Sequence, residues 1–347
     1  MIFPSSNARS MRRFQLNLLR LENRDVPSRA YGLGTNNTLF RFETDNPNSF
    51  IDSFAIQGLE VGERIRSIDF QPSTGRLFAL GIVPTATDDI GRIYTIDLDT
   101  GDATRVGSGP FSTTLRASGS YSMDFNPRVD LIRIVSSENQ NLRVNPRTGE
   151  LAGVDADLTF GAGTTGPIVA VAYDQNFTGT PTTTLFGIDF GADRLVVQGG
   201  VNGNPSPNTG QINDVGSLGI VTREGLFGFD IQVNQDTGRS EGFAAMRSNA
   251  DGLVRLYNID LETGQAQSLG FVGNGTTTFC GLSVVPPRIQ VVGADASGGP
   301  HVKVYDAISN SFRLEFLAYD AKFIGGVRVA SDSVSVRSKS PSRSLSA

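Results

Sequence analysis

The chain has 347 residues, of which 38% are hydrophobic and 19% charged, and it contains 40 glycines and 16 prolines. This composition supports an apolar core divided into short elements and excludes a chain that is disordered throughout. No stretch reaches the roughly 18 apolar residues that a membrane-spanning helix requires. The formal net charge is −5, but residues 1–28 carry +3 and residues 331–347 carry +2, which leaves −10 for the body between them. Because an acidic body repels phosphate backbones, no nucleic-acid partner is expected.

Several residue types that commonly carry chemistry are scarce. The single cysteine, Cys280, excludes an intrachain disulfide and a multi-cysteine metal cluster. Tryptophan is absent and His301 is the one histidine, which removes the commonest sugar-stacking surface and the commonest base at neutral pH. Residues 29–286 contain neither histidine nor lysine, so proton transfer there would fall to Asp, Glu, Tyr or Cys280, and a Ser-His-Asp site is excluded. The sequence therefore predicts no metal site and no cofactor.

A unit of four short strands recurs along the chain. Each copy contains runs of β-branched and aromatic residues that alternate with polar ones and are separated by Pro, Gly and Asp. An aromatic position in the first run recurs at Phe70, Phe125, Tyr173 and Phe229, with spacings of 55, 48 and 56 residues. A recurrence of about 50 residues is typical of the blades of a β-propeller. The expected strands of the four copies are 67–72, 76–80, 92–97 and 103–107; 122–127, 131–135, 141–145 and 151–154; 169–173, 183–188, 194–198 and 212–215; and 228–231, 241–246, 254–259 and 265–270.

Two fragments at the ends of this region complete a fifth unit. The runs 30–33, 38–42 and 51–56 lack a first strand, and the run 279–285 lacks a unit of its own. We expect 279–285 to pair with residues 30–34 as the inner strand of the first blade. The sequence thus predicts an all-β, five-bladed propeller over residues 29–286, closed by this C-terminal strand. Closure of the ring removes the strand edges that an open stack of these units would expose. The alternative fold for these strands is a two-sheet sandwich.

The flanking regions differ in composition from the repeats. We place a domain boundary at Pro286-Pro287, after which residues 288–330 form a small β-rich unit. Eight of the 17 residues in 331–347 are serine, which predicts a disordered tail. Residues 1–28 are a basic, targeting-like segment, within which 11–21 has apolar residues at helical spacing. This short amphipathic helix is either an export signal or a frayed terminus.

The repeat region carries the strings MDFNPRVDLIRIV at 123–135 and QNLRVNP at 140–146, with YGL at 31–33 and RIYTI at 92–96. Over most of residues 29–286 it resembles the domain-of-unknown-function 4394 family. The resemblance implies a β-propeller found in bacterial, often extracytoplasmic proteins, and it brings no established activity.

The segments on either side carry two further resemblances. LENRDVPS at 21–28, behind a basic start, is similar to an N-terminal segment of many large planctomycete proteins of exported type. Residues 290–330, with GGPHVKVYD at 298–306 and GGVRVA at 325–330, resemble one FG-GAP-type repeat of integrin-like propellers. Such repeats come in arrays with an aspartate-rich calcium loop, whereas here a serine-rich tail follows, which indicates an incomplete unit. Together the resemblances imply a secreted or cell-surface protein.

Aspartates recur beside the aromatic positions of the first strands. Asp69, Asp124, Asp174 and Asp230 could converge on the channel of a propeller, where a pair of carboxylates would suit glycoside hydrolysis. The structural interpretation is that each aspartate caps the turn after its strand through hydrogen bonds from the backbone to its side chain.

Polar residues also interrupt the apolar strands of the second copy. Arg133, Asn141 and Arg143 lie in runs whose two faces are expected to be buried, and a buried guanidinium group requires partners. One interpretation is an internal network with neighbouring polar side chains, namely Asp124, Asn126 or Asp130. The other is a polar patch near the channel mouth that contacts an anion or a glycan through the planar fork of arginine donors.

These observations favour a noncatalytic, monomeric propeller module of an exported or cell-surface bacterial protein that binds a protein or a glycan. The alternative is a carboxylate-dependent hydrolase that acts on a saccharide or lactone at the propeller channel. A purely structural spacer within a larger surface protein is a third possibility. The candidate binding residues are Asp69, Asp124, Asn126, Arg133, Asn141, Arg143 and Asp230.

Overall fold

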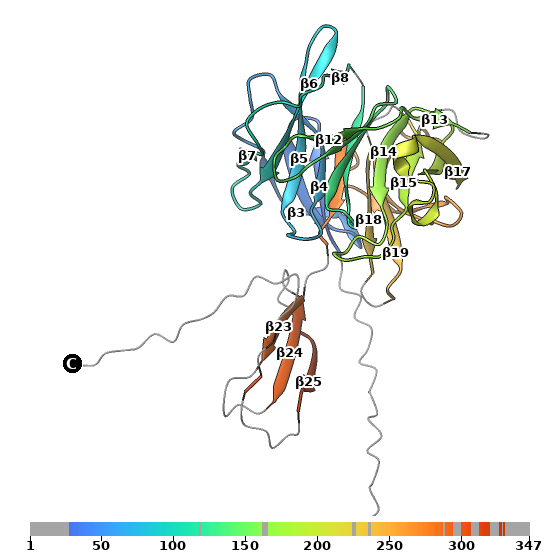
Figure 1. The fold of residues 1–347 in the computed structure, drawn as a ribbon. Helices are drawn as coiled ribbons and strands as arrows, with labels where there is room; N and C mark the ends of the chain where they lie inside the picture. Colours follow the sequence, from blue (N-terminus) through green and yellow to red (C-terminus); the bar gives the residue numbers. More distant parts are fainter. Residues whose placement is uncertain are drawn as a thin grey trace, which may run out of the picture.

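The structure, a computed structural model, describes residues 28–117, 119–161, 166–223, 227–234, 237–286, 289–293, 300–306, 312–319, 326–327 and 329. These residues form an all-β fold whose sheets are mainly antiparallel, with two single-turn 3-10 helices, η1 (Val201–Gly203) and η2 (Pro207–Thr209) (Figure 1). None of the helices in this part of the chain is long and apolar enough to cross a membrane. The expectations for residues 1–27 and 331–347 fall outside the described residues.

Within the described part of residues 29–284, the strands form five sheets, each built mainly from strands that follow one another in sequence (Figure 1). The first has the order β22 (Phe279–Val284), β1 (Arg29–Gly34), β2 (Thr38–Glu43), β3 (Asn46–Ala55). The second contains β4 (Arg64–Phe70), β5 (Leu77–Pro84), β6 (Asp88–Ile96) and β7 (Ala103–Arg105), with β8 (Leu115–Arg116) paired to β6. The third contains β9 (Tyr121–Asn126), β10 (Leu131–Ser136), β11 (Asn141–Val144) and β12 (Leu151–Val154).

The remaining strands follow the same plan with two additions. The fourth sheet contains β14 (Ile168–Tyr173), β15 (Leu185–Asp189), β16 (Arg194–Gln198) and β17 (Gln211–Ser217), and β13 (Thr159–Phe160) pairs in parallel with β17. The fifth contains β18 (Gly228–Val233), β19 (Ser240–Arg247), β20 (Val254–Ile259) and β21 (Ala266–Phe271). A separate sheet of β23 (Ile289–Gly293), β24 (His301–Asp306) and β25 (Phe312–Leu317) holds the C-terminal unit. The sequence did not indicate β8 and β13, since two-residue strands have no periodicity to read.

The last strand of the repeat region pairs with the first one. β22 lies antiparallel to β1 with Tyr31 opposite Ser283 and Gly32 opposite Leu282. This is the expected pairing of 279–285 with 30–34. Both strands are almost entirely buried, as expected for strands whose two faces pack against neighbours.

A tight turn between the third and fourth strands recurs in several sheets. In the turn between β11 and β12, the Asn145 side chain accepts a hydrogen bond from the Arg147 N–H, and Gly149 has a φ of +70°. A Cβ at Gly149 would lie 2.3 Å from the Val106 carbonyl oxygen of the preceding sheet. Glycine is therefore required here both for the left-handed backbone and for the close approach of two sheets.

The apolar core lies between neighbouring sheets rather than in one central mass. Among the described residues, five clusters of buried apolar side chains each join two adjacent sheets. The first strands of the sheets also lie beside one another: β4 contacts β22 and β9, β14 contacts β9 and β18, and β18 contacts β22. This arrangement brings the side chains of five first strands toward one another and positions the polar groups described next.

Candidate functional site

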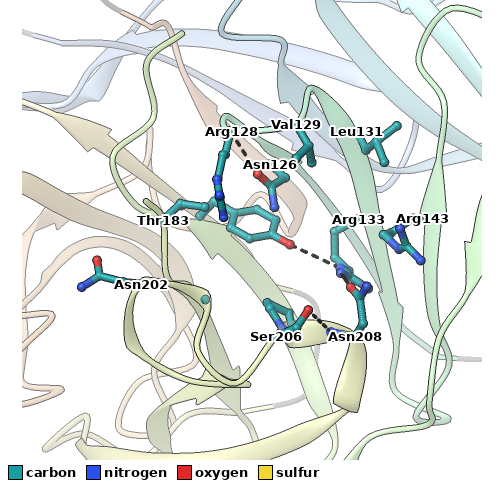
Figure 2. Close-up of a pocket in the computed structure, with 13 residues that line it drawn as sticks. Asn126, Arg128, Val129, Leu131, Arg133, Arg143, Thr183, Asn202, Ser206 and Asn208 are labelled. Carbon is teal, nitrogen blue, oxygen red and sulfur yellow. Dashed lines mark hydrogen bonds between the residues drawn. The ribbon is translucent and has the colours of Figure 1, made fainter. Parts of the chain in front are cut away.

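A cavity of about 180 Å³ opens between the third and fourth sheets (Figure 2). Its lining comes from the end of β9 and the turn that follows it, from β10, β11, the end of β14 and the connection to β15, and from the segment that contains η1 and η2. The lining residues are Asn126, Arg128, Val129, Leu131, Arg133, Arg143, Tyr173, Thr183, Asn202, Gly203, Ser206, Pro207 and Asn208.

Arg133 is held rigidly at the base of this cavity. Its Nη1 donates to Asn141 Oδ1 and to Asp155 Oδ2, both at 2.6 Å. Its Nη2 donates to Asn208 Oδ1 at 2.6 Å, and its Nε donates to the Tyr173 hydroxyl at 3.4 Å (Figure 2). The side chain is only 2% exposed. With all three nitrogens engaged, Arg133 has a structural role: it joins β10 to β14 and to η2.

Arg143 shares the carboxylate of Asp155 with Arg133. Arg143 Nε and Nη2 donate to the two oxygens of Asp155, both at 2.8 Å, in a bidentate pair. Burial opposes ionisation of Asp155, but the hydrogen bonds from Arg143 and Arg133 outweigh it, so the pKa of this carboxyl lies below its usual value. The Arg143 side chain is 28% exposed and lines the cavity.

The segment from Gly200 to Gly210 is shaped by the same network. Asn141 Nδ2 donates to the Pro207 carbonyl oxygen at 3.2 Å, and Gln198 Nε2 donates to the same oxygen at 2.9 Å. The Ser206 side chain caps η2 by accepting from the Asn208 N–H. The segment thus contributes Asn202, Ser206 and Asn208 to the cavity wall.

The cavity carries an excess of positive charge. None of its lining residues is acidic, and three are arginines. Asp155, behind the wall, neutralises one charge of the Arg133 and Arg143 pair. Arg128 is exposed and forms no ion pair with any carboxylate in the described part of the chain. The cavity therefore has a local surplus of two positive charges, although the net charge of the body is strongly negative.

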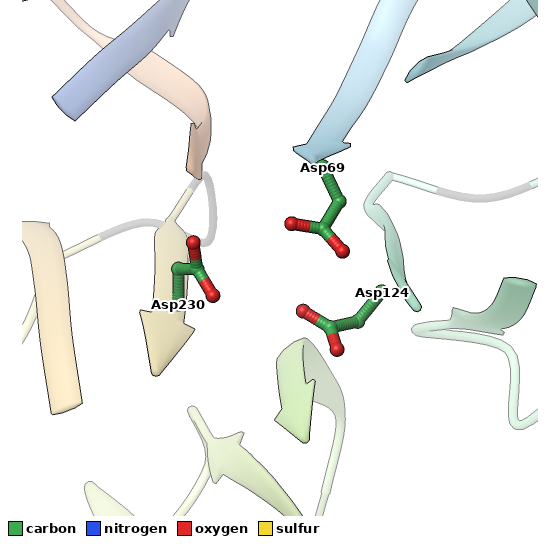
Figure 3. A group of neighbouring side chains, drawn as sticks. All are labelled: Asp69, Asp124 and Asp230. Atoms are coloured by element: carbon green, nitrogen blue, oxygen red, sulfur yellow. The ribbon is translucent and has the colours of Figure 1, made fainter. Parts of the chain in front are cut away.

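A second polar group lies where the first strands meet. Asp69 of β4, Asp124 of β9 and Asp230 of β18 point toward one another (Figure 3), and their oxygens lie within 4.8 Å of one another. Each side chain is about 1% exposed. We call these three residues the hub carboxylates.

Each hub carboxylate accepts a backbone N–H from the neighbouring sheet. Asp69 Oδ2 accepts from Phe125 at 2.8 Å, Asp124 Oδ1 from Tyr173 at 2.9 Å, and Asp230 Oδ2 from Val284 at 2.6 Å. Ser283 of β22 donates to Asp69 and contacts Asp230. Although carboxylate oxygens at this spacing could hold a metal ion, these hydrogen bonds give the hub carboxylates a structural role between adjacent sheets.

Burial dominates the ionisation of the hub carboxylates. It raises the pKa of Asp69 and Asp124 well above the usual value, and repulsion from the neighbouring hub carboxylates raises both further. Burial raises the pKa of Asp230 to about 7, although hydrogen bonds from Val284, Ile231 and Ser283 oppose it. The hub therefore favours the protonated form of its carboxyl groups more strongly than water does.

Comparison with protein families gives one match. The model of the family described as "Domain of unknown function (DUF4394)" matches residues 38–283. The chain belongs to this family. No curated protein matches the DUF4394 chain.

Three solved structures are similar to the DUF4394 chain in shape. A nidogen/laminin complex gives a TM-score of 0.44 at 11% identity, covering 83% of this chain and 93% of that one. A protein from Lactobacillus plantarum gives 0.39 at 13% identity, with 87% and 82% covered. A functionally unknown protein from Desulfotomaculum acetoxidans DSM 771 gives 0.36 at 17% identity, with 86% and 85% covered. All three scores are below 0.5, so neither fold nor function is inferred from them.

The candidate residues named from the sequence fall into two separate groups in the DUF4394 chain. Asn126, Arg133 and Arg143 line the cavity, and Asn141 lies behind it as a partner of Arg133. The others are the hub carboxylates. The partners expected for the arginines were wrong: the carboxylate is Asp155, whereas Asp130 accepts hydrogen bonds from Gln71 and Ser73 instead.

Sequence reasoning missed three residues of the cavity network, namely Tyr173, Asp155 and Asn208. Asp155 directly follows β12, and its N–H donates to the Asn141 carbonyl oxygen, so its place beside β11 could have been found from strand pairing. Asn208 lies 75 residues after Arg133, in a segment with no strand pattern. Nothing in the sequence signals that contact.

Asp174 does not join the hub. Its carboxylate accepts from the Thr184 N–H at 2.6 Å and from the Thr183 hydroxyl at 3.2 Å, across the β14–β15 hairpin. The turn-capping interpretation holds only in part for the hub carboxylates. Asp69 and Asp230 do accept the N–H of the next residue, at 2.8 and 2.6 Å, but both also bond to a neighbouring sheet.

Proposed function

We propose that this DUF4394 chain is a noncatalytic binding module of an exported or cell-surface bacterial protein, and that it binds a protein or a glycan through the cavity between the third and fourth sheets. In this proposal the five sheets are the blades of a five-bladed β-propeller, closed by β22 in the first blade. The contacts between successive first strands, the apolar clusters between adjacent sheets and the β22–β1 pairing support this architecture.

The single observation that carries the binding proposal is a preorganised polar cavity. Arg133, Asn141 and Asp155 hold its base through buried hydrogen bonds, so its polar groups do not need to be ordered when a ligand arrives. Its volume, about 180 Å³, is below the roughly 300 Å³ at which pockets for drug-sized ligands begin. The cavity therefore suits one sugar unit or one side chain of a larger partner.

The hydrolase alternative finds no support in these two sites. Glycoside hydrolysis needs two carboxyl groups that reach the substrate. The hub carboxylates are buried and engaged with backbone N–H groups, and no residue that lines the cavity carries a carboxyl group.

The remaining parts of the proposal concern the flanks. We propose that residues 1–28 direct export, that residues 29–286 form the propeller as a monomer, and that residues 288–330 are an incomplete FG-GAP-like unit. The resemblances of LENRDVPS and GGPHVKVYD support these assignments. Cell fractionation of the tagged, full-length protein tests the first of them, and recovery from the cytoplasm alone contradicts it.

A cavity-blocking variant tests the binding site. Val129 lines the cavity and is 54% exposed, so Val129→Trp narrows the cavity without disturbing the core. Val61→Trp, at a position 98% exposed and outside the cavity lining, is the matched control. We expect wild type and Val61→Trp to bind the same ligand from an array of extracellular polysaccharides and surface-protein peptides, and Val129→Trp to lose it. Equal binding by both variants contradicts the proposed site.

A further inference from the structure

We infer that the cavity recognises a carboxylate-bearing sugar unit, held between Arg128 and Arg143. This inference rests on the proposed function, because it names the ligand class of the same cavity. It follows from the donors that remain free, from the local charge and from the polar lining around the two arginines.

The three arginines of the cavity differ in the donors they have left. Arg133 uses all three nitrogens on protein groups and is buried, so it cannot turn toward a ligand. Arg143 uses Nε and Nη2 on Asp155, which leaves Nη1 of a side chain that faces the cavity. Arg128 is exposed, and its guanidinium group has no carboxylate partner among the described residues. Both arginines line the same cavity (Figure 2), so we infer that a carboxylate bound there receives donors from them.

Charge favours an anion over a neutral ligand. The two free guanidinium faces belong to a group with three positive charges and one negative charge, Asp155. Because the body as a whole is acidic, the positive charge of this cavity differs in sign from the net charge of the body.

The neutral part of the lining favours a sugar over an acidic peptide. Asn126, Asn202 and Ser206 add amide and hydroxyl groups to the wall, and such groups pair with vicinal sugar hydroxyls. An Asp or Glu side chain would bring methylene groups to these polar groups and leave them without partners, which costs affinity. The volume admits one unit, so the rest of the glycan chain would run outside the mouth, past exposed Asn202.

The test compares acidic sugar oligomers with their neutral methyl esters and with an acidic peptide. Oligomers of galacturonate, glucuronate and mannuronate are titrated at low salt against wild type, with their fully methyl-esterified forms as neutral counterparts and tri-glutamate as the acidic peptide. We expect at least one uronate oligomer to bind at least tenfold more tightly than its ester. Arg128→Gln should weaken that binding at least fivefold, whereas Arg147→Gln, an exposed arginine outside the cavity lining, should leave it unchanged.

Each other outcome overturns the inference and bears differently on the proposed function. If the uronate oligomers and their esters bind with equal affinity, and Val129→Trp abolishes that binding, charge has no role but the cavity still binds a glycan. Preference for tri-glutamate removes the sugar but keeps a protein-binding cavity. If no uronate and no ester binds, and Val129→Trp binds another ligand as well as wild type does, both the inference and the proposed site are wrong.

Discussion

Ser283 Oγ lies 2.8 Å from Asp69 Oδ1 and 3.1 Å from Asp230 Oδ2, so one hydroxyl of the last strand of the repeat region bridges carboxyl groups from the second and fifth sheets. The Phe70 N–H donates to the same hydroxyl at 3.1 Å. A serine hydroxyl has one proton to donate and cannot serve two ionised carboxylates at once. The geometry is satisfied when one of the two carboxyl groups is protonated, which agrees with the raised pKa of both.

The raised pKa of Asp230 makes the free energy of unfolding depend on pH in a predictable direction. Well below pH 4, Asp230 is protonated in both the folded and the unfolded chain. As the pH rises, the unfolded residue ionises at its ordinary pKa, whereas the folded one holds its proton to about pH 7. The free energy of unfolding contributed by this group is therefore fully present at low pH and is lost as the pH rises toward 7.

Asp230→Asn isolates this effect, because the variant cannot ionise. It loses stability at pH 5, since an amide has one acceptor oxygen and cannot accept the hydrogen bonds from both Ile231 and Val284, which reach different oxygens of Asp230. We expect its deficit relative to wild type to shrink by roughly 2 kcal/mol between pH 5 and pH 7 in urea denaturation. The hydrogen bonds from Arg255 lower the pKa of Asp251 to about 2, so the Asp251→Asn control should differ from wild type by a constant amount over this range. A constant difference for Asp230→Asn as well would contradict a protonated hub.

Asp155 is the group whose loss should most disturb the cavity. Asp155→Ala leaves Arg133 buried without its anion, and breaking such a pair costs about 3 kcal/mol or more. Asp157→Ala is the matched control, because Asp157 pairs with Arg116 at the surface, where an ion pair contributes less than about 1 kcal/mol. Chemical denaturation of the three proteins at pH 7 measures both values. Similar losses for the two variants would show that the Arg133 pair is not a structural element.

The sequence was most informative where the chain repeats and least informative where it does not. The β22–β1 pairing followed from an incomplete first unit and an unpaired last strand, since each incomplete sheet needs a partner for its edge. The contact between Arg133 and Asn208 could not be derived, because it depends on how a 3-10 turn folds back over the sheet.

The alignment of the units was wrong in one copy. Spacing of aromatic residues matched Phe229 with Phe125. In the structure, Asp69 accepts from the N–H of Phe70 and Phe125, and Asp230 accepts from the N–H of Ile231 and Val284. Ile231 therefore holds the place of Phe70 in its sheet. The hydrogen bonds of the aspartates, rather than the apolar side chains, define equivalence, and a single sequence does not display those bonds.

Gly228 tests the contact between the fifth sheet and β22. A Cβ at this position would lie 2.4 Å from both the N and the Cβ of Leu282, so β18 and β22 would have to move apart. We expect Gly228→Ala to lower the free energy of unfolding by about 1 to 3 kcal/mol, as overpacking does in a core. Gly109→Ala, where nothing lies within 4 Å of the added Cβ, should stay within about 0.5 kcal/mol of wild type. A neutral Gly228→Ala would mean that β18 and β22 are not packed as described.

Cys280 reports whether β22 leaves its sheet without unfolding of the rest. Burial raises the pKa of this thiol to about 12, and its Sγ lies 3.6 Å from the Leu33 carbonyl oxygen of β1. Because a thiol reagent attacks the exposed thiolate, native Cys280 should react only when β22 detaches.

If the first sheet holds β22 as firmly as its core burial implies, the rate of labelling should follow the equilibrium population of the globally unfolded chain in dilute urea. In Gly228→Ala the logarithm of the labelling rate should then rise in proportion to that variant's loss of stability. Labelling that is fast in water and independent of urea would show that β22 opens locally, and it would contradict the proposed closure of the first sheet by this strand.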